Sequence, residues 1–168
     1  MKPTLAPLLM SLCALLVSVS AYGQRESSSG KLLRGLDQLH MHVVIESERD
    51  VDRDMRNQMA DVVELELRRA MIPLLPYVVN EPDENIPLLL VSMAVDRNGP
   101  RPVTRINLQI IDRVVVARNK ENTTATIYSA RTDAASNSDA TLARDTRDGL
   151  RDLMKRFIED YNAVNPRR

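Results

Sequence analysis

The sequence predicts an α+β domain with the element order β-α-β-β-β-α, in which two amphipathic helices cover one face of a mainly antiparallel four-stranded sheet. Apolar residues alternate or run continuously in four segments, which is typical of strands, and recur every three or four residues in two others, which is typical of helices. Short turn sequences join the last three strands. The strand–helix–strand start also permits one right-handed parallel crossover.

Residues 1–23 have the pattern of a cleaved export signal. Lys2 is their only charge, the apolar run 5–19 follows it, and small residues lead to Ala21 and Gly23, after either of which cleavage is expected. The apolar run is shorter than the ~20 residues that span a bilayer. We therefore expect a periplasmic or secreted product with no membrane span after cleavage.

Composition excludes several classes of function. The 23 basic and 23 acidic side chains cancel, and aromatic residues make up only 3%, which argues against a nucleic-acid surface. The single cysteine, Cys13, lies in the expected signal, so neither a disulfide framework nor a cysteine-rich zinc site is predicted. No cofactor is indicated.

The remaining chain divides into a leader and a domain. Residues 24–35 are polar, with Ser27–Gly30 at their centre, and predict a flexible leader. Residues 36–166 form the predicted domain.

The first strand is predicted over residues 39–46, where the odd positions are all apolar. The even positions carry His40, His42 and Glu46, so we expect these three side chains on a solvent-exposed face of the sheet.

The first helix is predicted to begin near Asp50 and to end before Pro73. One apolar stripe runs along it. The segment 74–84 is expected to be an irregular connection, because Pro76 and Pro82 interrupt it.

Three further strands and a second helix follow. A polar loop is expected over 132–139, and Ser136 or Ser138 is expected to cap the last helix, which ends at Asn165. The strands are predicted over residues 88–95, 105–117 and 123–130.

The His-x-His pattern is the one candidate for a metal site. Side chains two apart on a strand point to the same face, so His40 and His42 could bind one ion, with Glu46 further along that face. The alternative is that both imidazoles lie on a solvated sheet face. A metal- or small-ligand-binding protein, with weak hydrolase activity, is the second functional hypothesis.

Glu66 is the one carboxylate that shares the apolar stripe of the first helix. We expect it to be partly buried in a structural ion pair with a base such as Arg105 or Arg113.

The sequence does not support an enzyme. It has no G-x-S-x-G elbow and no glycine-rich phosphate loop. The leading hypothesis is a non-enzymatic module that binds an envelope or secreted protein partner. An apolar docking patch is expected at Leu74, Leu75, Tyr77 and Val78. A purely structural homo-oligomer subunit is a third hypothesis.

Three segments carry a resemblance to a family: residues 43–46, 64–72 and 157–166. They resemble a group of small exported bacterial α+β proteins of no established activity, with the pattern ELxLRRAxI followed by FIxDYxAVNP. The resemblance implies export and the fold and brings no site. Where a glycine is usual after Ala70, this chain has Met71.

Overall fold

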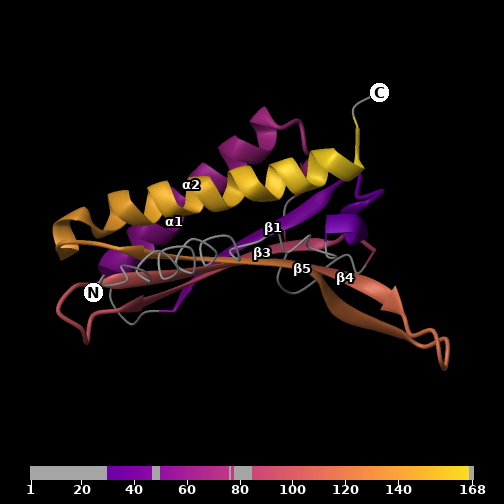
Figure 1. Cartoon of the computed structure of the whole chain (residues 1–168), viewed down its shortest axis with the longest axis horizontal. Coiled ribbons are helices and arrows are strands. Elements are labelled where there is room, and N and C mark those ends of the chain that lie inside the picture. Colours follow the sequence, from indigo (N-terminus) through magenta and orange to yellow (C-terminus); the bar gives the residue numbers. More distant parts are fainter. Residues whose placement is uncertain (1–29, 47–49, 76, 78–84, 167–168) are drawn as a thin grey trace, which may run out of the picture.

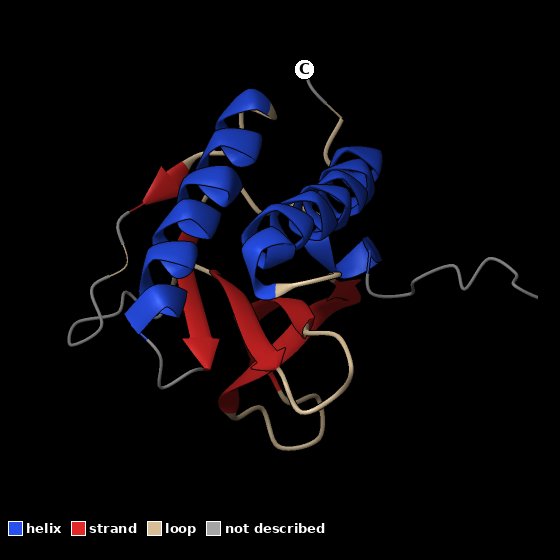
Figure 2. Cartoon of the chain, turned by 90° about the vertical axis from the view of Figure 1, so that its left-hand side faces the viewer, coloured by secondary structure: helices blue, strands red, loops and turns tan. Residues whose placement is uncertain are grey.

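The computed structural model describes residues 30–46, 50–75, 77 and 85–166. Two long helices lie on one face of a mixed five-stranded sheet, and the described residues place no helix on its other face (Figures 1 and 2). The elements, in chain order, are η1 (Gly30–Leu33), β1 (Leu39–Glu46), α1 (Asp50–Arg69), β2 (Leu74–Leu75), β3 (Leu88–Asp96), β4 (Val103–Val115), β5 (Asn122–Ala135) and α2 (Asp139–Val164).

The sheet has the strand order β2-β1-β3-β4-β5. β1 is parallel to both β2 and β3, while β3, β4 and β5 form an antiparallel meander. The predicted α+β class is confirmed, and β1-α1-β3 is the parallel crossover that the sequence permits. The prediction of four strands was wrong, because Leu74 and Leu75 pair with Leu39 and His40 before Pro76 interrupts the chain.

β5 is longer than predicted and continues through the expected loop to Ala135. Its last residues pair in register with the start of β4, so that Ala134 lies opposite Thr104. Ala134 is buried beneath α2, close to Gly149. The last residues of β5 therefore form a strand because of the neighbours that they contact, and not because of their own β-propensity.

The core lies between the sheet and the helices. Val43, Val91 and Leu108 stand side by side on β1, β3 and β4, and all three are buried. α2 covers β4 and β5: the ring of Phe157 lies 5.4 Å from that of Tyr128 in an edge contact. The apolar residues of the alternating pattern thus face the helices, as predicted.

Part of the expected leader belongs to the domain. Leu33 is fully buried. The side-chain amide of Asn165 donates to the Leu33 carbonyl (2.8 Å) and accepts from the backbone N–H of Gly35 (2.7 Å). The prediction that 30–35 are flexible was therefore wrong, because Leu33 supplies apolar surface that the domain buries. Residues 1–29, which include the expected signal, lie outside the described residues.

Arg97, in the turn between β3 and β4, joins both helices to the sheet. Its guanidinium donates two hydrogen bonds to Asp52 (2.7 and 3.1 Å) and one to Asp139 (3.1 Å). Asp52 lies in the first turn of α1 and Asp139 begins α2, where carboxylates also suit the helix dipole. The hydrogen bonds that it donates to Asp52 raise the pKa of Arg97.

α1 ends in a left-handed cap. Met71 has φ +56°, its N–H bonds to the Arg68 carbonyl (2.9 Å), and the N–H of Ile72 bonds to that of Leu67 (3.0 Å). This pair of hydrogen bonds is the Schellman motif, which favours glycine at the position that Met71 occupies. The substitution noted in the sequence thus has a backbone cost.

Glu66 forms a structural ion pair, but not with the expected bases. It lies 3.1 Å from Arg69 and 4.0 Å from Arg151 on α2. Arg105 and Arg113 were the wrong partners, because both lie on β4 positions that face away from the helices.

Candidate functional site

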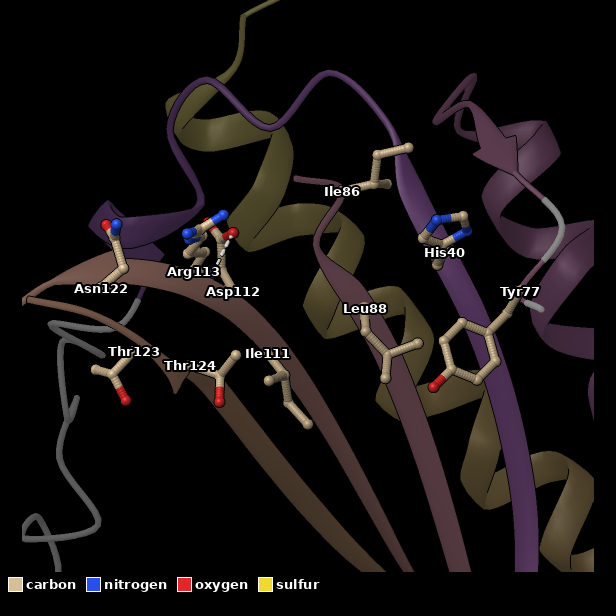
Figure 3. A pocket seen from close by; sticks show the side chains of 10 residues that line it. All are labelled: His40, Tyr77, Ile86, Leu88, Ile111, Asp112, Arg113, Asn122, Thr123 and Thr124. Atoms are coloured by element: carbon tan, nitrogen blue, oxygen red, sulfur yellow. Dashed lines mark hydrogen bonds between the residues drawn. The ribbon is translucent and has the colours of Figure 1, made fainter. Parts of the chain in front are cut away.

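The open face of the sheet carries a pocket of about 360 Å³ at the end where β1 and β3 begin. His40, Leu88 and Ile111 lie next to each other across β1, β3 and β4 and belong to its wall. Figure 3 shows the complete lining, which consists of His40, Tyr77, Ile86, Leu88, Ile111, Asp112, Arg113, Asn122, Thr123 and Thr124. The pocket thus joins residues from β1, from the segment after β2, from the start of β3 and from the β4–β5 hairpin.

His40 is the buried polar group of this pocket. It is only 7% exposed, although its position on the uncovered face had predicted contact with solvent. Its Nδ1 lies 3.4 Å from the Leu75 carbonyl, and its Nε2 is buried with no hydrogen-bond partner among the described residues. A carbonyl only accepts, so Nδ1 carries the proton in this contact, and Nε2 of the neutral ring presents a lone pair.

Tyr77 causes this burial. Its ring centroid lies 5.9 Å from that of His40, in an edge arrangement, and 5.0 Å from that of His42. The prediction of a solvated histidine face was therefore wrong for His40, because the segment after β2 brings an aromatic ring over β1 (Figure 3).

Glu46 lies at the opposite end of β1, beside Ala94, and is exposed. In the ranges that the structure describes, no group of three or more His, Cys, Asp or Glu side chains could hold a metal ion. Both histidine rings therefore lie against Tyr77, and among the described residues they do not belong to a set of metal ligands.

The polar rim of the pocket comes from the β4–β5 hairpin, whose end bends away from the helix layer (Figure 1). The register between these strands shifts at Ile110 and Ile111. Just beyond the shift, the Asp112 carboxylate accepts from the backbone N–H of Arg113 (2.7 Å). Sequence reasoning missed this wall; the one available signal was Asp112, which interrupts the apolar alternation of its strand.

Two residues of the expected docking patch, Leu74 and Leu75, form β2. Leu74, Leu75 and Tyr77 are half-buried and line a second hollow of about 590 Å³, between β2 and the end of α1. Met71, at 66% exposure, also lines it. Val78 lies outside the described residues. Tyr77 is the residue common to this hollow and the His40 pocket.

No family model and no curated protein matches this chain. Among solved structures, similarity is found to a dodecamer of a PelC variant from Paraburkholderia phytofirmans, with 16% identity over 72% of this chain and 86% of that one (TM-score 0.44). A hypothetical protein from Chlamydia trachomatis has 10% identity over 74% and 93% (TM-score 0.41). A minor lipoprotein from Acinetobacter baumannii has 13% identity over 79% and 95% (TM-score 0.35).

These similarities are too distant to assign a function, so the site is interpreted from its own residues. None of the helices in the described ranges is long and apolar enough to cross a membrane.

Proposed function

We propose that this chain is an exported, non-enzymatic binding module, and that it holds a segment of an envelope or secreted partner protein in the His40 pocket. Export is inferred from the pattern of residues 1–23.

The observation that carries the proposal is the buried Nε2 of His40, which has no hydrogen-bond partner among the described residues. Leaving such an atom unsatisfied costs about 1–3 kcal/mol, so a folded domain rarely keeps one without a use. A hydrogen-bond donor brought by a ligand would remove that cost. His40 belongs to the wall of the pocket, so a ligand bound there would lie next to its ring.

The residues that line the pocket indicate which chemical group of a ligand would fit it. Ile86, Leu88 and Ile111 offer apolar surface, while Asn122 and Thr124 offer hydrogen bonds at the rim. At about 360 Å³ the pocket is near the lower limit for ligand sites. One apolar side chain flanked by an N–H or O–H donor fits this description, and single anchors of this kind dominate many protein interfaces.

The setting of His40 favours binding over acid–base catalysis. Its Nδ1 faces a backbone carbonyl, the Leu75 oxygen, whereas a catalytic histidine is commonly oriented by a carboxylate. Its nearest ring neighbour is Tyr77, which packs edge-on.

The test compares two histidine variants of the purified chain as baits for an envelope extract. His40→Phe keeps the ring shape but removes the lone pair, while His42→Phe makes the same change on a residue outside the pocket lining. We expect quantitative mass spectrometry to show a partner that wild type and His42→Phe retain and that His40→Phe loses at least about tenfold, as for an interface anchor.

Equal recovery of all proteins by the three baits would contradict the proposal. Native mass spectrometry separates the alternative of a small-molecule site. A bound small molecule that His40→Phe alone loses would replace the protein partner with that ligand.

A further inference from the structure

β5 forms one edge of the sheet and has no strand partner on its outer side among the described residues. After the register shift near Ile127, residues 128–135 pair with β4 without interruption. This stretch contains neither proline nor lysine, and its two charged residues, Arg131 and Asp133, have opposite signs. It therefore presents a regular row of backbone donors and acceptors.

Two opposite charges lie on this edge strand at alternate positions. Arg131 and Asp133 share the open face, opposite Asn107 and Arg105 of β4, and both are exposed. No ion pair joins either side chain to another in the described part of the chain. One residue separates the two charges. If two copies of such a strand pair antiparallel about that residue, each positive charge lies opposite a negative one.

We propose that a second copy of this chain pairs antiparallel with β5, with Thr132 of each copy on the two-fold axis. In this register Arg131 of each copy lies opposite Asp133 of the other, so that the same ion pair forms twice. A shift of the register by two residues removes both pairs, which makes this alignment the preferred one.

The β5 side chains next to the two-fold axis are small. Ala130 lies opposite Ala134 of the second copy, and Ser129 opposite its Ala135, so no large side chains meet near the axis. α2 contacts both β4 and β5, and strands lie ~4.8 Å apart. The α2 helices of the two copies would then lie roughly 10 Å apart, which is a normal packing distance.

The dimer would place both pockets on one face of a continuous sheet. A two-fold axis between antiparallel edge strands is perpendicular to the sheet, so the open faces of the two copies coincide. Thr124, on the rim of the pocket, is roughly 25 Å along β5 from Thr132. This arrangement would favour a partner with repeated binding segments.

Charge exchange at the edge tests the inference. Sedimentation velocity of the purified full chain should show a concentration-dependent dimer for wild type. Arg131→Asp or Asp133→Arg alone should each raise the dissociation constant by about tenfold or more, because two attractions become two repulsions. The double variant, with both exchanges, should return to within about threefold of wild type, since the pairs re-form with reversed sign.

Arg56→Asp is the control for net charge, because this exposed residue lies on α1, which contacts β1, β2 and α2 but not β5 among the described residues. Circular dichroism checks that every variant is folded. A monomeric wild type at all concentrations would refute the inference, and so would a dimer that the single variants leave intact or that the double variant fails to restore. None of these outcomes depends on partner binding in the His40 pocket, so the two proposals fail separately.

Discussion

Replacing His40 by phenylalanine should make the domain more stable, although it removes a polar contact. The side chain is 7% exposed, its Nε2 has no partner among the described residues, and its single hydrogen bond is long, at 3.4 Å. Relief of the unsatisfied nitrogen should contribute about 1–3 kcal/mol, while loss of the weak bond to Leu75 should cost about 1 kcal/mol. Phenylalanine also keeps the edge contact with Tyr77. The expected net gain is about 1 kcal/mol.

Urea denaturation at neutral pH measures this change. We expect the midpoint of His40→Phe to rise without a change of slope, and Tm to rise by about 2–4 °C for a chain of this size. His42→Phe is the matched control and should change the free energy of unfolding by less than about 0.5 kcal/mol, because it is half-buried and has no orphaned atom. A loss of more than about 1 kcal/mol in His40→Phe would refute the reasoning, since Nε2 would then have a partner in the free protein.

Three further changes should alter stability. Arg97→Ala should cost about 2–4 kcal/mol by chemical denaturation, because the carboxylate that it pairs with at the start of α1 is only 3% exposed, whereas exposed Arg144→Ala should cost less than about 1; equal losses would contradict this. Met71→Gly should gain about 1 kcal/mol in the same denaturation measurement, because glycine adopts the left-handed conformation without strain; a loss of stability would contradict this. Burial and the hydrogen bond to Asp160 raise the pKa of Tyr128 from its ordinary 10.0, so its contribution is complete below that pH and is lost as the pH rises above it. Tyr128→Phe should therefore flatten the fall in unfolding free energy between about pH 9 and 11, measured by denaturation at each pH; an unchanged slope would exclude Tyr128 as its source.

The long elements could be predicted because their patterns repeat. β1 has the bounds that its alternating residues indicate, and α1 begins at the expected Asp50. β2 could not be predicted, because two residues carry no period and form a strand only beside β1. The extension of β5 was missed for a similar reason, since its alanines and polar residues are held in place by β4 and α2.

The candidate site was only partly visible in the sequence. The His-x-His pattern identified the right strand and face, but it predicted solvent where Tyr77 covers His40. The segment of Tyr77 was expected to dock a partner, and nothing in its composition indicates that it folds back over β1. The rim at Asp112 depends on a change of strand register, which is decided by pairing in three dimensions.

The amide of Asn165 ties the end of α2 to the carbonyl of Leu33 and the N–H of Gly35, next to the start of β1. Hydrogen bonds thus join the end of α2 to the last residue of η1, the first described element, and to Gly35 just after it. A circular permutant that joins these two points by a short linker and opens the chain at Asn119, in the hairpin between β4 and β5, should keep the same architecture. The same packing would then form from segments synthesised in a different order. The new chain ends would lie beside the pocket rim, where a label or a second domain could be attached.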